Sequence, residues 1–178
     1  MKRLELLTKQ TAHSRTFENL YPTLMTVAQV TAKTYDRSED LRMSIDEGLS
    51  VINDHHAERL FQEMLDNAFK FSQPGNIVMV KWCFVESDAI LEVRNQGEGV
   101  PSESLEVIKH ALTEPHLGAH EKYWGLRIIQ QISNLYHGTL SIESAPSKGW
   151  TIRVYFPNII PVEENAHKAA MTGAPFPY

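Results

Sequence analysis

The sequence predicts an α+β sandwich, in which a mixed and mostly antiparallel sheet is covered on one face by helices. Two observations lead to this fold class. Segments with the apolar spacing of helices alternate along the 178-residue chain with strand-like runs. In addition, two pairs of these runs are separated only by short polar turns. Because tight turns join antiparallel strands, a doubly wound parallel sheet fits the pattern less well.

The amino-terminal half contains two expected helices and a pair of short strands. Residues 1–20 are polar and mixed, and we interpret them as a loose arm or the end of a helix. Helical spacing begins at Pro22, which is acceptable in a first turn. The runs 41–45 and 49–52 are expected to pair across a tight turn. The helix at 55–72 has the broadest apolar face in the sequence.

The carboxy-terminal half continues the alternation of helices and strands. Its expected elements are, in order, strands 77–85 and 89–94, a short helix from Ser102, a loop at 113–123, a helix at 124–137 and strands 139–144 and 150–156. Gly138 stands where the helix at 124–137 needs a C-cap. Beyond Pro157 the prolines follow no period, so residues 158–178 are expected to form a flexible tail.

Composition excludes several classes of protein. With 17 Lys and Arg against 22 Asp and Glu, the net charge of -5 argues against a general nucleic-acid binder and against docking on anionic lipid. No apolar run approaches the roughly 18 residues that a membrane span requires, so no membrane insertion is expected. The single cysteine, Cys83, cannot form an internal disulfide, which indicates a cytoplasmic location.

Three polar residues interrupt the apolar pattern of the helix at 55–72. Glu63, Asn67 and Lys70 are spaced four and three residues apart, so they form one stripe along successive turns. Such a stripe presents a carboxylate, an amide oxygen and an ammonium group, which together suit Mg²⁺ and phosphate chemistry. Taken alone, a solvated helix face with ordinary surface charges explains these residues better.

Two further segments are candidates for ligand binding. The turn Asn95–Pro101 follows a strand and contains Gly97 and Gly99, which allow close approach of the backbone to a ligand. The helix that begins at Trp124 carries Gly125 in its first turn, and a helix N-terminus is a natural seat for phosphate. Each is equally explained, by itself, as an ordinary turn or helix start.

These segments together resemble the catalytic domains of histidine kinases. Residues 63–72 resemble the N box, residues 95–101 the G1 box and residues 124–129 the end of the G2 box. The segment from Leu135 through Thr151 follows the last helix and hairpin of that family. The resemblance covers about residues 22–157 and implies a two-layer sandwich of Bergerat type, which we place at residues 21–157.

The resemblance also implies roles for individual residues. It makes Asn67 the Mg²⁺ ligand, Glu63 a residue that supports the chemistry, and the segment from about Ser102 to Tyr123 a lid. Lys70, from its place in the stripe, is expected to offset phosphate charge. Residues expected to contact ATP are Asn67, Asn95, Gly97, Gly99, Gly125 and Leu126. Residues 1–20 would then be an arm or the stump of a dimerisation helix, through which a homodimer could form.

The sequence departs from the family pattern at two positions. Asn95 stands where the family has an aspartate that accepts a hydrogen bond from adenine, and a neutral amide oxygen makes a weaker contact. Tyr123 stands where the G2 box has a glycine. No histidine of the chain lies in a long amino-terminal helix with the context of a phosphoacceptor.

These features leave three hypotheses open. The first is an ATP–Mg²⁺-binding catalytic domain that transfers a phosphoryl group to a histidine on a separate segment or chain, with that phosphoacceptor domain or a response regulator as partner. The second is a degenerate module that no longer binds nucleotide and docks a response regulator or a kinase. The third is a kinase that phosphorylates serine on a partner protein.

Overall fold

The computed structural model describes residues 17–19, 21–45, 50–52, 55–85, 88–113 and 123–157. Its elements are, in order, β1 (Phe17–Asn19), α2 (Tyr21–Thr34), the 3-10 helix η1 (Ser38–Asp40), β2 (Leu41–Ile45), β3 (Ser50–Ile52), α3 (His55–Lys70), β4 (Val78–Val85), β5 (Asp88–Asn95), α4 (Ser102–Thr113), α5 (Trp124–Leu135), β6 (Thr139–Ala145) and β7 (Gly149–Phe156). The predicted tail and most of the predicted arm lie outside the described residues, as does the lid segment 114–122.

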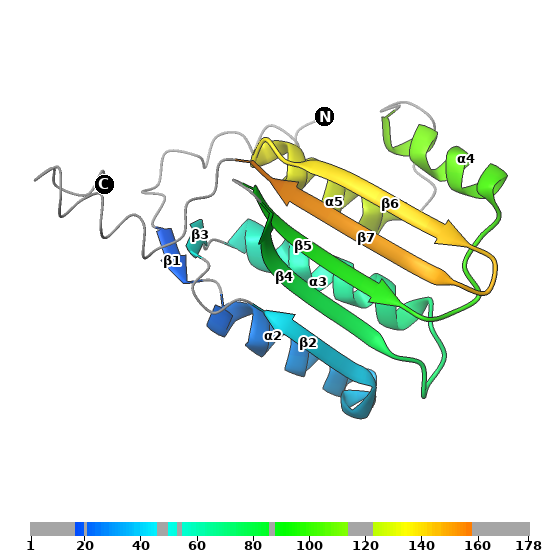
Figure 1. Cartoon of the computed structure of the whole chain (residues 1–178), viewed down its shortest axis with the longest axis horizontal. Helices are drawn as coiled ribbons and strands as arrows, with labels where there is room; N and C mark the ends of the chain where they lie inside the picture. Colours follow the sequence, from blue (N-terminus) through cyan, green and yellow to red (C-terminus); the bar gives the residue numbers. More distant parts are fainter. Residues whose placement is uncertain are drawn as a thin grey trace, which may run out of the picture.

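The main sheet confirms the predicted fold class. Its five strands are ordered β2-β4-β5-β7-β6, with β2 parallel to β4 and every other neighbouring pair antiparallel. Helices α2, α3 and α5 lie together on one face of this sheet, while α4 lies beyond them near β6 (Figure 1). No helix among the described residues is long and apolar enough to cross a membrane.

The predicted hairpin of 41–45 and 49–52 is wrong. Strand β2 pairs with β4, in the register Leu41 to Val78, and β3 pairs with β1 in a separate two-stranded sheet. Parallel strands require a crossover, and α3 supplies it between β2 and β4. The alternate side chains of β2, including Met43, pack against the core from this edge position, which the short turn by itself did not reveal.

The covered face of the sheet ends in one row of residues. Side chains alternate along a strand, so the inward positions of β5 are Ala89, Leu91, Val93 and Asn95, all of them buried. The register places Asn95 opposite Trp150 of β7, and beyond it Ser144 of β6. This terminal row is where the apolar core stops and polar or half-buried side chains begin.

The end of α5 is capped one residue earlier than predicted. His137, and not Gly138, takes the left-handed conformation, with φ of 57°. The backbone N–H groups of His137 and Gly138 donate to the oxygens of Asn134 and Ser133, at 3.0 and 2.8 Å, which is a Schellman pattern. Gly138 is needed for another reason, because a side-chain carbon there would lie 2.6 Å from the backbone oxygen of Tyr155.

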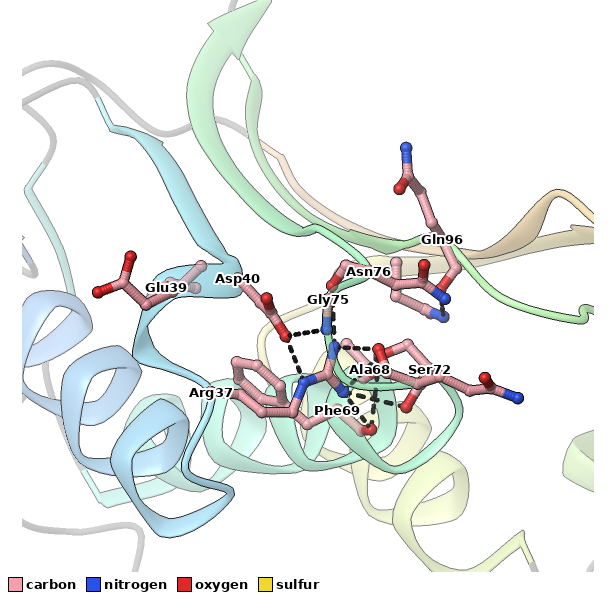
Figure 2. A network of polar contacts seen from close by, with 12 residues as sticks. Arg37, Glu39, Asp40, Ala68, Phe69, Ser72, Gly75, Asn76 and Gln96 are labelled. Atoms are coloured by element: carbon pink, nitrogen blue, oxygen red, sulfur yellow. Dashed lines mark hydrogen bonds and ion pairs between the residues drawn. The ribbon is translucent and has the colours of Figure 1, made fainter.

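A buried arginine closes the carboxyl end of α3. Arg37 is only 6% exposed, and Figure 2 shows its guanidinium group facing the backbone at the end of that helix. Its hydrogen bonds go to Oδ2 of Asp40 (2.6 Å) and to the backbone oxygens of Phe69 (3.1 Å), Ser72 (3.0 Å), Gln73 (2.7 Å) and Asn76 (2.8 Å). We call this set the Arg37 clamp.

The clamp satisfies backbone groups that a helix end leaves without partners. The last carbonyl groups of a helix have no intrahelical donors, and a cation near them is favoured by the helix dipole. Asp40 completes the arrangement, because it also accepts a hydrogen bond from the backbone N–H of Gly75 at 3.0 Å. The clamp therefore fixes the loop 71–77 between α3 and β4 as well as the helix end.

Replacing Arg37 with lysine should destabilise the fold by about 2–4 kcal/mol, because an ammonium group cannot reach all of these acceptors and leaves buried carbonyl groups unpaired. Urea unfolding measures the change. Arg42→Lys is the matched control, since Arg42 is exposed and donates only to the nearby oxygens of Glu39 and Leu41. We expect it to stay within about 0.5 kcal/mol of the natural protein. Equal effects of the two substitutions would contradict the stabilising role of the Arg37 clamp.

The clamp also predicts a dependence of stability on pH. The hydrogen bonds from Arg37 and Gly75 lower the pKa of Asp40, so the unfolded chain binds a proton at this carboxyl more readily than the folded one. This contribution is present above the pKa of the unfolded chain and is lost as the pH falls through that of the folded state. The difference in the free energy of unfolding between the natural protein and Asp40→Asn should therefore become smaller as the pH is lowered from 7 to 3. Asp36→Asn, an exposed change in the same turn, serves as control, and a constant difference would contradict the prediction.

Candidate functional site

A cavity of about 1040 Å³ opens at the terminal row of the sheet. Its walls come from the end of α3 and the loop after it, the end of β5 and the turn after it, the start of β7, the helix α4 and the start of α5. Of the predicted site residues, those that line the cavity are Asn67, Lys70, Asn95, Gly97, Gly99 and Leu126. Glu63 and Gly125 lie next to it, against Asn67.

Cations outnumber carboxylates around the cavity. Lys70 and Lys148 line it, and so does Arg94, although Arg94 belongs to the outward-facing row of β5; Glu98 is the only acidic residue in its described walls. Each cation comes from a different segment, namely α3, β5 and the turn between β6 and β7. The chain has an overall charge of -5, so this is a local concentration of positive charge suited to an anionic ligand.

The predicted stripe on α3 is only partly exposed to the cavity. Lys70 is exposed, with its Nζ 5.8 Å from the ring centre of Phe71. Glu63 is half-buried and forms an ion pair with Arg59 one turn earlier. Burial raises the pKa of the Glu63 carboxyl, and nearby Arg59 opposes that shift. The hypothesis of a solvated helix face is therefore wrong for Glu63, which is largely withdrawn from solvent.

The amide of Asn67 has an unused donor. Its Nδ2 is buried and has no hydrogen-bond partner, which is costly for a polar group in a protein interior. Gly125 lies beside it, and a side-chain carbon at that glycine would be 2.8 Å from Oε2 of Glu63 and 3.1 Å from Nδ2 of Asn67. The glycine therefore lets the first turn of α5 approach the α3 stripe directly.

The side chain of Asn95 has a fixed orientation. Asn95 is 1% exposed, and its Nδ2 donates to the backbone oxygens of Phe71 and Gln96, both at 3.2 Å. Carbonyl oxygens can only accept, so the amide nitrogen must face them. Oδ1 therefore remains as an acceptor at this wall of the cavity. A carboxylate in the same position could not make either bond.

The glycines of the turn after β5 pack against protein backbone. A side chain at Gly97 would meet the oxygen of Phe71 at 2.6 Å, and one at Gly99 would overlap the oxygen of Ala145. Gly99 also has φ of +65°, which favours glycine. The turn is tied to the β6–β7 turn by the N–H of Ser147, which donates to the oxygen of Glu98 at 2.6 Å. These glycines shape the wall of the cavity by packing.

The donor set fits a magnesium ion only if the ligand brings oxygens of its own. Among the described residues, no group of three His, Cys, Asp or Glu side chains could hold a metal. Asn67 offers one amide group whose nitrogen is unpaired, so its orientation is not fixed by hydrogen bonds from Nδ2. Mg²⁺ accepts such an arrangement when phosphate oxygens and water complete its shell.

Sequence reasoning missed two aromatic residues of the cavity. Phe71 and Trp150 both line it, and their ring centres are 5.9 Å apart. The signal for Trp150 lies in the alternation of β7, where it is the inward residue nearest the strand's start. Two further cations are close in sequence to the start of α5, but Lys122 lies outside the described residues and Arg127 is absent from the cavity walls.

Two curated proteins with similar sequences are histidine kinases. The chain is 30% identical over 105 residues to the sensor histidine kinase TmoS of Ectopseudomonas mendocina, and 28% identical over 106 residues to the signal transduction histidine-protein kinase ArlS of Staphylococcus aureus (strain USA300). These matches cover 56% and 57% of this chain but only 11% and 24% of the two relatives. A sequence model described as histidine kinase-, DNA gyrase B-, and HSP90-like ATPase matches residues 52–160.

Solved structures of histidine kinases share the fold. The mycobacterial sensor histidine kinase MprB has a TM-score of 0.67 at 22% identity, over 84% of this chain and all of that chain. The catalytic domain of histidine kinase ThkA has a TM-score of 0.65 at 18% identity, over 82% of this chain and 98% of that chain. At these identities the likeness concerns the fold, and it confirms the predicted sandwich.

The orientation of Asn95 predicts that Asn95→Asp is destabilising. The introduced carboxylate would face two carbonyl oxygens without a proton to donate, at a cost of about 2–3 kcal/mol. Because the two carbonyl oxygens disfavour the charged form, the pKa of the introduced carboxyl would lie above its unfolded value of about 4, so the cost should shrink as the pH falls toward 4. Urea unfolding at pH 7 and pH 3 measures both effects. Asn134→Asp is the control, because exposed Asn134 only accepts a bond from Gln130, which an aspartate can also accept. A neutral effect of Asn95→Asp would contradict the assigned orientation.

Proposed function

Because the chain belongs to the family of histidine kinase-, DNA gyrase B- and HSP90-like ATPases, we propose that residues 21–157 are an ATP–Mg²⁺-binding catalytic domain of histidine kinase type. It would transfer the γ-phosphoryl group of ATP to a histidine on a separate segment or chain. The observation that carries this proposal is the cavity that Asn67 and Asn95 both line, with cations around it. One amide has an unpaired donor, and the other has an acceptor held in place.

The base would be recognised at Asn95. The amide nitrogen is committed to the oxygens of Phe71 and Gln96, so Oδ1 offers an acceptor for an exocyclic amino group. Adenine carries such a donor, whereas guanine places an oxygen at the equivalent position and would be repelled. A geometrically fixed neutral acceptor can thus take the place of the family's aspartate.

The phosphates would lie toward the stripe on α3 and the start of α5. Lys70 would offset their charge, and the N-terminus of α5 adds N–H groups at the same side. Asn67 would hold the magnesium ion, which supplies neutralisation of phosphate charge when it is bound with the nucleotide. Gly125 leaves room for this arrangement beside Asn67.

Glu63 would serve the transfer as a proton acceptor. In the transfer, a bond forms between the acceptor imidazole nitrogen and phosphorus while the bond from phosphorus to the β,γ-bridging oxygen breaks. The imidazole N–H must then lose its proton. Burial raises the pKa of Glu63, which brings this carboxylate closer to the basicity that proton transfer near neutral pH requires. Serine as the acceptor would use the same groups, and only the partner decides between the two.

The second candidate is the module that no longer binds nucleotide and docks a response regulator or a kinase. The observation that favours it is Tyr123, which lines the cavity and stands where the family has a glycine. ATP affinities of Asn95→Asp and Tyr123→Gly proteins separate the two candidates. A large gain in affinity indicates a decayed site. Unchanged or weaker binding, which the orientation of Asn95 supports, indicates an adapted one.

Calorimetric titration with ATP and Mg²⁺ tests the proposal. We expect saturable binding that GTP does not match, and a binding constant for ATP–Mg²⁺ at least about tenfold weaker in Asn67→Ala, or about 1.4 kcal/mol. Asn67 makes no hydrogen bond through Nδ2, so this variant should keep its stability. Asn134→Ala, on the exposed side of α5, should bind as the natural protein does. No heat and no shift in melting temperature at millimolar ATP–Mg²⁺ would overturn the proposal.

A further inference from the structure

We propose that Trp150 is a base-stacking residue of the cavity, forming with Phe71 one aromatic wall on which the purine ring of a nucleotide packs. The inference rests on the proposed function and adds a residue to it. It assigns a role to a large side chain that neither the spacing of the sequence nor the stripe on α3 explains.

The position of Trp150 follows from the alternation along β7. Ile152, Val154 and Phe156 face the helices and are buried, with 3%, 0% and 8% of their surfaces exposed. Trp150 continues this inward row toward the start of the strand, but it is only half-buried and it lines the cavity. A large apolar side chain on the covered face is thus left without complete packing, at the place where a ligand could supply it.

The register brings the indole next to the acceptor for the base. Trp150 is the direct partner of Asn95 in the antiparallel pair of β7 and β5. Gly149, just before it, fits closely against the backbone of Asn95, since a side-chain carbon there would lie 2.9 Å from the carbonyl carbon of Asn95. This close contact between the two backbones keeps Trp150 next to Asn95. A ring that reaches Oδ1 of Asn95 lies beside the indole.

The two aromatic rings form one surface. The ring centres of Phe71 and Trp150 are 5.9 Å apart and their planes are inclined by 34°. This separation is that of two rings in direct contact, so no base fits between them. A base would lie against the wall that they form together. The Phe71 carbonyl also accepts from Nδ2 of Asn95, which ties the wall to the base acceptor.

Stacking on this wall would offset the weaker polar contact at Asn95. A neutral amide oxygen accepts a less stable hydrogen bond than the carboxylate that the family uses at this position. Stacking of one base on aromatic side chains changes affinity by roughly tenfold to a hundredfold. The contribution of Trp150 is therefore large enough to decide whether nucleotide is held.

Calorimetric titration of Trp150 variants with ATP–Mg²⁺ tests the inference. Trp150→Leu keeps apolar bulk but removes the ring, and we expect affinity to fall at least about tenfold. Trp150→Phe keeps a ring and should bind within about threefold of the natural protein. Tyr155→Leu is the matched control, because it removes an aromatic ring from the outward-facing row of the same strand. Its affinity should be unchanged.

Fluorescence supplies a signature that a purely structural role would not give. Emission of the natural protein should change on saturation with ATP–Mg²⁺, and most of that change should be absent in Trp150→Phe, although Trp82 and Trp124 remain. Equal or tighter binding by folded Trp150→Leu would overturn the inference while leaving the proposed function intact. If that variant does not fold, an unaltered fluorescence change in Trp150→Phe would overturn it. Absence of binding by the natural protein would instead contradict the proposed function, and the inference with it.

Discussion

The Arg37 clamp determines the shape of the cavity wall, because it holds the end of α3 and the loop after it in one arrangement. A single guanidinium group contacts backbone oxygens from Phe69 to Asn76, a stretch that includes Phe71. The carbonyl of Phe71 in turn orients Asn95, and its ring contacts Trp150. Arg37 thus supports, through this loop, both the orientation of the Asn95 amide and the contact between Phe71 and Trp150, although it does not line the cavity.

Asn95 illustrates how a substitution in a family motif can be supported by its surroundings. In isolation, an asparagine in place of an aspartate reads as a weakened site. In this fold the amide nitrogen has two carbonyl partners, and the oxygen is left facing outward from them. Asparagine is therefore the residue that this environment requires. Under the proposed function, the departure would exchange a charged acceptor for a neutral one with a fixed orientation.

The sequence was sufficient for elements whose pattern is local. The helix at 55–72 was predictable from its apolar period, and the hairpins of β4–β5 and β6–β7 from short turns between alternating runs. Features decided by distant partners were not predictable. The pairing of β2 depends on a strand more than thirty residues later, and the orientation of Asn95 on a carbonyl 24 residues earlier. The C-cap of α5 was not predictable for the same reason. Close approach to the backbone of Tyr155 requires a glycine at position 138, whereas the left-handed residue is His137, one position earlier.

The positive charge around the cavity was also not predictable from local patterns in the sequence. The three lining cations come from segments that are far apart in sequence, so no window along the chain reveals a basic cluster. Lys70, taken alone, is explained by the sequence as an ordinary surface charge. The three cations meet because β5 ends where β7 begins, at one end of the sheet, and α3 ends beside them. An acidic chain can therefore present a local positive field to an anion, because salt largely screens exposed charges that lie more than about 10 Å away.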